Sequence, residues 1–212
     1  NPDRDKRPTK WRVIYNGFNA DFSPMGKNKS DSLIAAVGVK PESPFILHVG
    51  SSLPRKNRRL LLDMVKYLDT SWDGYICYAG EAADKDLLVH MHRLGLQERV
   101  IFVVKPDHTT LVALYCSCEA FIFPSFSEGF GWPIIEAQAC GAPVIASNIE
   151  PMPEVSGGAA LHADPHNPVE FATAFTSLQS KGARRKVVQN GFSNVRRFGT
   201  SQMIQSYLEL YH

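Results

Sequence analysis

The sequence predicts an α/β domain built on a doubly wound parallel sheet of about six strands, with helices on both faces and a helical C-terminal end. Short apolar runs such as residues 44–50 and 75–80 are typical of strands buried on both faces, and amphipathic segments separate them. This alternation indicates βαβ units, because parallel strands need helical crossovers. The composition agrees, since 212 residues with 44% hydrophobic and 21% charged residues suit one packed domain.

The predicted elements follow one another along the chain from residue 11. Strands are expected where short apolar runs end at turn residues: 11–15, 44–50, 75–80, 100–104, 120–123 and 143–146. Helices are expected where apolar residues recur three or four positions apart: 31–37, 57–68, 84–94, 109–118, 133–140, 168–179, 183–197 and 201–211. The last helix carries an apolar stripe, which needs a surface to cover. Residues 1–10 are polar and are interpreted as a linker, which leaves 11–212 as the domain.

Composition excludes several classes of protein. The 23 basic and 21 acidic residues nearly balance, so nucleic acid is not the expected partner. No apolar stretch approaches the ~20 residues of a membrane-spanning helix, and no signal peptide is recognised. The four cysteines form no CxxC and no cluster with zinc spacing, so no metal site is predicted. A reduced, cytoplasmic protein is the simplest interpretation.

Two loops at the carboxyl ends of predicted strands carry candidate chemistry, because ligands of open parallel sheets bind at this edge. The first runs from Gly50 to Asn57 and combines small residues with two cations just before a helix. That pattern favours a phosphate cradle, in which exposed amides and a fixed ammonium hold an anion. The alternative is an ordinary turn with solvated charges.

The second loop, residues 124–136, is the most informative stretch. Gly129 and Gly131 let an anionic ligand approach the backbone, and Pro133 suits the first position of the following helix. The amides at the helix start are expected to be free. Glu128 and Glu136 can flank a ligand with an anionic middle and a hydroxyl-bearing sugar ring at each end. In the alternative interpretation Glu136 stabilises the helix dipole and Glu128 is exposed.

Three sequence blocks occur in order: HVGSSLPRKN at 48–57, EGFGWPIIEAQACGAPVIAS at 128–147, and EPMPEV at 150–155. Together they resemble the C-terminal, donor-binding domain of GT-B glycosyltransferases, and more narrowly the retaining family 4 enzymes, many of which are mannosyl- or glucosyltransferases. The resemblance runs from about residue 13 to the last helix. Its most specific element is the pair of glutamates eight residues apart. It implies a Rossmann-like fold.

The resemblance implies a role for individual positions. Lys56 matches the lysine that neutralises the donor diphosphate, with Arg55 assisting and Gly50 and Ser51 in the same phosphate loop. Glu128 matches the catalytic glutamate beside the hexose and the reaction centre. The remaining donor-binding positions are the loop that holds hexose hydroxyls and phosphate (Gly129, Phe130, Gly131), the helix-start amides on the phosphate (Ile134, Ile135), the ribose glutamate (Glu136) and the nucleobase contacts (Lys105, Pro106).

Two positions depart from the family pattern. Ser51 stands where many relatives carry an arginine, which weakens the diphosphate site unless Arg55 or Arg58 substitutes. Val104 stands where a glycine is common after the fourth predicted strand, which alters the base pocket.

Other candidate signals have simpler interpretations. Asp84-Lys85-Asp86 matches the Asp-x-Asp string of metal-dependent glycosyltransferases, but it lies at a helix start, where aspartate caps. His48 is interpreted as a satisfied core histidine. The late helices are basic, which indicates either a solvated face or contact with an anionic membrane that bears a lipid-linked acceptor. The basic residues are Arg184, Arg185, Lys186, Arg196 and Arg197.

The predicted function is hexose transfer, with mannose the first expectation, from a nucleotide diphosphate sugar to an acceptor hydroxyl with retention, in polysaccharide or glycolipid biosynthesis. No cofactor and no metal are expected in the site. The acceptor, a saccharide or a lipid-linked one, is expected on an N-terminal domain that this chain lacks, so the chain alone is expected to bind donor weakly and transfer nothing. The alternatives are a non-catalytic nucleotide-sugar-binding module and, more weakly, half of a nicotinamide-dependent dehydrogenase.

Overall fold

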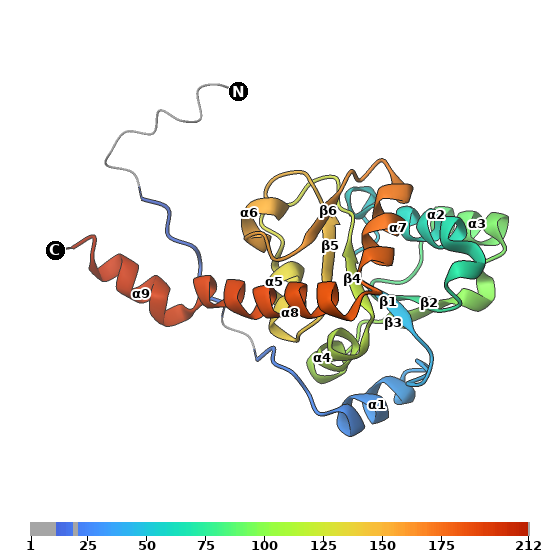
Figure 1. Ribbon diagram of the computed structural model, residues 1–212, viewed down its shortest axis with the longest axis horizontal. Helices are drawn as coiled ribbons and strands as arrows, with labels where there is room; N and C mark the ends of the chain where they lie inside the picture. The colour runs from blue at the N-terminus through green and yellow to red at the C-terminus, as the bar shows by residue number, and fades with distance from the viewer. Residues whose placement is uncertain (1–11, 19–20, 212) are drawn as a thin grey trace.

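The computed structural model describes residues 12–18 and 21–211, and in them a six-stranded parallel sheet lies between two layers of helices (Figure 1). The strands are β1 (Phe45–Gly50), β2 (Tyr75–Gly80), β3 (Val100–Val104), β4 (Ala120–Phe123), β5 (Val144–Ser147) and β6 (Leu161–Ala163). Their order across the sheet is β3-β2-β1-β4-β5-β6. All adjacent pairs are parallel, which confirms the predicted doubly wound α/β class.

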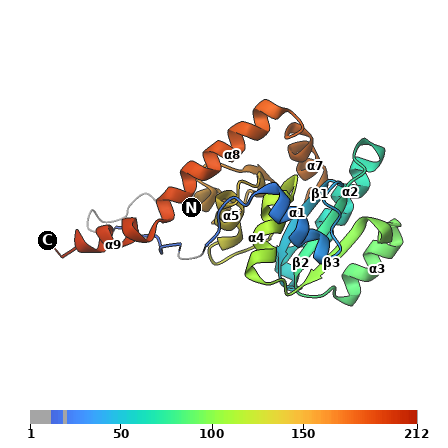
Figure 2. The same ribbon diagram turned by 90° about the horizontal axis from the view of Figure 1, so that it is seen from below.

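The helices cover both faces of the sheet, and Figure 2 shows them on either side of it. They are α1 (Lys27–Ala36), α2 (Arg59–Leu68), α3 (Lys85–Leu94), α4 (His108–Ser117), α5 (Trp132–Ala139), α6 (Met152–Ser156), α7 (Pro168–Ser177), α8 (Lys181–Val195) and α9 (Thr200–Leu208). Residues of α1, α4, α5 and α6 pack on one face of the strands, and those of α2, α3 and α7 pack on the other. Alternate residues of β1 supply both cores, since Ile46 belongs to the second and Leu47 to the first.

The prediction of a strand at residues 11–15 is wrong. Residues 12–17 form no strand, and Trp11 and the predicted linker at 1–10 lie outside the described residues. Tyr15 packs edge-on against Phe198 at a centroid distance of 5.3 Å, so this segment lies against the C-terminal part of the chain rather than in the sheet. The sixth strand is β6, which sequence reasoning missed because three residues carry no alternation or run to detect.

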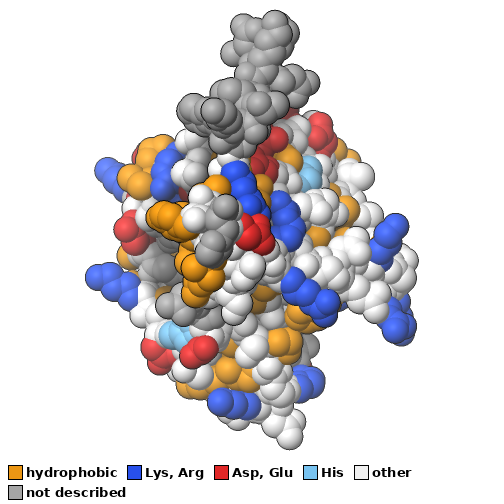
Figure 3. All heavy atoms as spheres, turned by 90° about the vertical axis from the view of Figure 1, so that its left-hand side faces the viewer, with side chains coloured by type: hydrophobic (Ala, Val, Ile, Leu, Met, Phe, Trp, Pro, Cys, Tyr) orange, Lys and Arg blue, Asp and Glu red, His pale blue; other side chains and the backbone are white. Residues whose placement is uncertain are grey.

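The last helix extends away from the body of the domain (Figures 1 and 2). Helix α9 contains no buried residue, and half or nearly half of Ile204, Tyr207 and Leu208 is exposed, at 50%, 46% and 51%. Figure 3 views the molecule from this side and shows hydrophobic side chains exposed next to basic ones. No helix among the described residues has the length and apolarity needed to span a membrane.

Candidate functional site

The candidate site lies where the sheet topology reverses. From β1 the chain proceeds through β2 and β3 to one edge, and from β4 it proceeds through β5 and β6 to the other. β1 and β4 are neighbours at this reversal, and the loops at the carboxyl ends of such strands are the usual ligand position in open parallel sheets. The 3₁₀ turn Pro54–Lys56 follows β1, and residues 124–131 follow β4.

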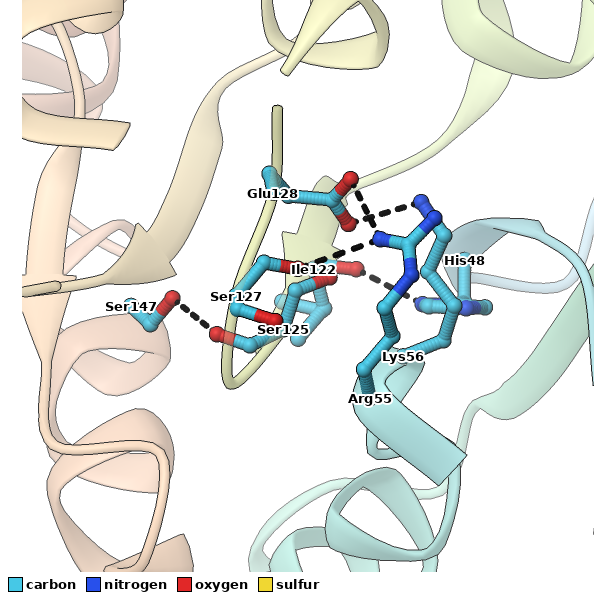
Figure 4. A network of polar contacts seen from close by, with 8 residues as sticks. All are labelled: His48, Arg55, Lys56, Ile122, Ser125, Ser127, Glu128 and Ser147. Carbon is cyan, nitrogen blue, oxygen red and sulfur yellow. Dashed lines mark hydrogen bonds and ion pairs between the residues drawn. The ribbon is translucent and has the colours of Figure 1, made fainter. Parts of the chain in front are cut away.

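An ion-pair triad joins these two loops (Figure 4). The Nζ atom of Lys56 lies 2.7 Å from Oε1 of Glu128, and Nη1 of Arg55 lies 2.7 Å from Oε2 of the same carboxylate. The side chains of Lys56 and Glu128 are only 9% and 7% exposed, whereas that of Arg55 is 41% exposed. Three predicted site residues from two distant loops are therefore in direct contact. Glu128 is not the solvent-exposed carboxylate of the alternative interpretation.

The electrostatics of the triad keep Glu128 ionised. Burial by itself raises the pKa of this carboxyl, but hydrogen bonds from Lys56 and Arg55 act in the opposite direction and the net effect is a lowered pKa. The Lys56 ammonium also lies 5.0 Å from the centroid of the Phe123 ring. A nearly buried cation and a nearly buried anion thus lie side by side at the carboxyl ends of β1 and β4.

Asn57, which sequence reasoning did not single out, holds the two loops in register. Its backbone is left-handed with φ of 51°, and its Nδ2 donates to the carbonyl oxygens of Pro124 at 3.1 Å and Pro165 at 2.7 Å. The amide of Phe126 donates to the Arg55 carbonyl at 2.8 Å. The available signal was the residue type, since asparagine tolerates the left-handed region better than most residues.

The glycine-rich loop leads directly into α5. Gly131 is the residue before the helix and has φ of 107°, a conformation that favours glycine. The helix begins at Trp132, so Pro133 is its second residue rather than its first. The amide of Ile134 donates to the Gly131 carbonyl at 2.9 Å, so the prediction that the helix-start amides are free is wrong for this one. The turn at Gly131 uses that donor internally.

Two neighbours of this loop differ in environment. Gly129 is exposed, and a Cβ placed on it would meet nothing within 4 Å, so its backbone is accessible to a ligand. Phe130 packs against Trp132, at a centroid distance of 4.5 Å, and contacts Phe198 edge-on. The side chains of Ile134 and Ile135 are fully buried, so only their backbones can serve a ligand.

Glu136 lies one turn into α5 and is held by a tyrosine that the sequence did not indicate. The hydroxyl of Tyr115, on α4, donates to Oε2 of Glu136 at 3.0 Å. Burial raises the pKa of Glu136. A half-buried carboxyl oriented by a buried phenol suits hydrogen bonds from ligand hydroxyls.

The loops after β1, β2 and β3 are linked at the same edge of the sheet. Gly80 has φ of 124°, and a Cβ there would lie 2.3 Å from the Gly50 carbonyl oxygen, so the close approach requires glycine. The amide of Lys105 donates to the Gly80 carbonyl at 2.7 Å, and Lys105 is itself left-handed with φ of 48°. Val104 remains in β3 and is 51% exposed. Ser51 and Pro106 are half-buried in these same loops.

His48 lies next to Gly50, at the start of the loop that follows β1. Its Nδ1 is 3.1 Å from the carbonyl oxygen of Ile122 and must carry the proton, while its Nε2 has no partner among the described residues. A Cβ on Gly50 would lie 3.4 Å from that Nε2. Burial lowers the pKa of His48 to about 3, helped by the nearby cations Arg58 and Lys56, so the ring is neutral. The interpretation of His48 as a satisfied core histidine therefore holds for one ring nitrogen only.

The Asp-x-Asp string is a helix cap, as its position indicated. The Asp84 carboxylate accepts a hydrogen bond from the Leu87 amide at 2.8 Å at the start of α3. Within the described residues no group of three or more His, Cys, Asp and Glu side chains is arranged to hold a metal ion. A cavity of about 760 Å³ lies nearby between the starts of α2, α3 and α7, but Lys56, Glu128 and Glu136 do not line it.

Fold and site together define a Rossmann-like sheet with a cluster of charged residues at its switch point. Residues 29–193 match the family model described as "Glycosyl transferases group 1", so the chain belongs to the group 1 glycosyltransferase family. The architecture is that of GT-B glycosyltransferases.

Individual relatives refine the comparison. The chain is 36% identical to O-antigen chain mannosyltransferase B from Escherichia coli over 174 residues, which are 77% of this chain and 45% of that protein. It is 30% identical to D-inositol 3-phosphate glycosyltransferase from Mycobacterium sp. (strain KMS) over 194 residues, 86% of this chain and 43% of that protein. The chain thus spans about half the length of the curated relatives it matches.

Solved structures agree with the fold. The crystal structure of Anabaena Alr3699/HepE in complex with UDP and glucose superposes with a TM-score of 0.82 at 23% identity, covering 94% of this chain and 56% of that one. The C-terminal domain of the group 1 glycosyl transferase LpcC from Francisella tularensis gives a TM-score of 0.67 at 21% identity, covering 82% of this chain and 94% of that one.

Proposed function

We propose that this domain binds a nucleotide diphosphate sugar and supplies the donor half of a retaining hexosyltransferase. The observation that carries the proposal is the Lys56–Glu128 pair where the loops after β1 and β4 meet, with Glu136 on the helix that follows. Cations and loop amides suit a diphosphate, and two carboxylates suit the hydroxyls of the hexose and the ribose. The names of the relatives support transferase chemistry, and the first of them supports mannose as the hexose.

Each residue has a defined role in the proposed transfer. As the bond between the anomeric carbon and the diphosphate breaks, negative charge grows on the leaving group. Lys56 and Arg55 stabilise that charge, which is catalysis by a preorganised electrostatic environment. Glu128 positions the hexose and stabilises positive charge at the anomeric carbon. Glu136 receives hydrogen bonds from the ribose, and Lys105 and Pro106 flank the base.

The acceptor is proposed to bind to a second domain, since the matched relatives are about twice as long as the region matched here. The chain alone is then expected to bind donor and to transfer nothing. Measurable transfer by the isolated chain to a saccharide or lipid-linked acceptor contradicts this part of the proposal.

A thermal-shift panel tests the donor. A ligand that binds only the folded state raises its melting temperature, so UDP, GDP, UDP-glucose and GDP-mannose are compared at matched concentration. The proposal predicts a shift with at least one of them and none with NADH. A shift with NADH alone favours the dehydrogenase alternative, and no shift with any nucleotide sugar contradicts the proposal.

A non-catalytic nucleotide-sugar-binding module is the second candidate. The feature that favours it is the serine at position 51, in place of the arginine of many relatives, because one cation fewer is then available to stabilise a leaving diphosphate. Glu128→Gln in a full-length protein separates the two. Loss of transfer with donor binding retained supports catalysis, whereas a wild-type protein that binds donor and never transfers supports the module.

Peripheral contact with a membrane is a further part of the proposal. Of the five basic residues in the late helices, Arg184 donates to the carbonyls of Glu119 and Cys118, and Arg197 donates to Asn194. Arg185, Lys186 and Arg196 then supply the charge toward anionic lipid. Co-sedimentation with vesicles that rises with anionic lipid content and falls with salt supports this contact, and insensitivity to both rules it out.

A further inference from the structure

The two cations expected to hold the donor diphosphate are already paired with a carboxylate of the domain itself. Lys56 Nζ and Arg55 Nη1 each lie 2.7 Å from one oxygen of the Glu128 carboxylate. Arg55 also donates to the Ser127 carbonyl at 3.1 Å, which ties its head group to the Glu128 loop. Among the described residues Glu128 is thus an internal anion that occupies the cationic part of the site (Figure 4).

An incoming diphosphate competes with Glu128 for these cations. The Glu128 side chain is 7% exposed, so water cannot fully replace a lost partner. Removing a partner from a nearly buried ion pair leaves an uncompensated charge, which is costly. A ligand that draws Lys56 and Arg55 away must therefore offer Glu128 other hydrogen bonds, or it loses affinity to the disruption.

An intact sugar donor and the nucleoside diphosphate left after transfer differ in this respect. Both carry the anion, but only the donor carries hexose hydroxyls, which donate hydrogen bonds to a carboxylate. Resting on the proposed function, we propose that Glu128 determines the preference of the site for the intact nucleotide sugar over the free nucleoside diphosphate. Glu128 rejects the free diphosphate by holding its cations, and it accepts the donor because the hexose satisfies the carboxylate.

The test is a set of calorimetric titrations of this chain with UDP, UDP-glucose, GDP and GDP-mannose. In Glu128→Gln the competing charge is absent, so the nucleoside diphosphate is expected to bind at least about five-fold tighter than in the wild type. The affinity for the nucleotide sugar increases less, because the amide accepts weaker hydrogen bonds from the hexose hydroxyls than a carboxylate does. The ratio of sugar to diphosphate affinity therefore falls.

Matched variants keep the outcome interpretable. Glu98→Gln removes the same charge from an exposed residue between α3 and β3. It lies at the amino ends of the strands, opposite the site, and is expected to leave both affinities unchanged. Glu128→Asp keeps the charge but shortens the reach to the two cations, so its diphosphate affinity should lie between wild type and Glu128→Gln. Glu128→Asp also replaces Glu128→Gln in the test if circular dichroism shows that Glu128→Gln is not folded.

The possible failures are distinguishable. If the wild type binds a nucleoside diphosphate and neither Glu128 variant binds it more tightly, this inference is wrong and the proposed function stands. A uniform gain for diphosphate and sugar forms, or an equal gain in Glu98→Gln, also overturns it by indicating general charge repulsion. If the wild type binds none of the four ligands, the proposed function fails and the inference fails with it.

Discussion

At the scale of single residues, the site depends on charges that are held out of water. The side chain of Lys56 is 9% exposed and is paired with Glu128 where the loops after β1 and β4 meet. Breaking such a pair from one side strands the other charge, whereas removing both charges together is far milder. The stability of the domain and the chemistry of its site are therefore coupled through this pair.

A double-mutant cycle measures that coupling. Lys56→Met keeps the aliphatic packing and is expected to lower the free energy of unfolding by about 3 kcal/mol, because Arg55 is left as the sole cation on Glu128. Lys56→Met combined with Glu128→Gln should recover at least about 1 kcal/mol of that loss. Urea unfolding of the four proteins provides the values, and strictly additive effects mean that the pair is not coupled.

His48 predicts a pH dependence of stability. Its pKa is about 3 in the folded protein, against 6.5 for an exposed ring, so the unfolded chain binds more protons between these values. The stability that this residue contributes is fully present above pH 6.5 and is lost as the pH falls toward 3. The loss amounts to about 2 kcal/mol at pH 5.

The matched variant for this prediction is His48→Leu, which cannot titrate. The difference in unfolding free energy between variant and wild type should shift in favour of the variant by about 2 kcal/mol between pH 7.5 and pH 5. A difference that stays constant over this range means that His48 has the same pKa in the folded and the unfolded protein, and it contradicts this prediction.

At the scale of elements, the cap of α3 decides between two interpretations of one motif. Asp84→Ala removes the hydrogen bond to the Leu87 amide and is expected to cost about 1 kcal/mol of stability, while nucleoside diphosphate affinity stays the same. Asp86→Ala is the control, since Asp86 lies within the first turn and is expected to change stability by less than about 0.5 kcal/mol. Metal-dependent donor binding that both variants abolish would support the metal interpretation instead.

Strong local patterns made most elements predictable. The runs at 75–80 and 120–123 coincide with β2 and β4, because a strand buried on both faces needs a continuous apolar stretch. The run at 100–104 coincides with β3, which lies at the edge of the sheet and is only partly buried. The segment at 11–15 has the composition of a strand but packs Tyr15 against Phe198 instead. The short strand β6 is held in the sheet by pairing with β5, a tertiary contact that cannot be predicted from its local sequence.

The candidate site residues that could be predicted are charged side chains in loops at the carboxyl ends of strands, where binding an ion is their usual role. Lys56 and Glu128 were identified from their loops and do meet. The side chains of Asn57, Tyr115 and His48 were not identified with the site, because their contacts depend on which loops the topology brings together. The engaged amide of Ile134 could not be foreseen either, since it depends on the turn at Gly131.

At the scale of the whole molecule, the strand order brings the site together. Lys56 and Glu128 are distant in the chain and meet because β1 and β4 are adjacent at the point where the winding reverses. Glu136 on α5 and Lys105 after β3 lie on the same side of the sheet, at the carboxyl ends of the strands. This arrangement supports the proposal of an elongated ligand with an anionic centre.

The most direct test of the account is a crystal structure of this chain with bound UDP or GDP. We expect the pyrophosphate within hydrogen-bond distance of Lys56 Nζ, and the ribose hydroxyls at Glu136. A nucleotide bound instead in the cavity between α2, α3 and α7, or a pyrophosphate without contact to Lys56, would contradict it.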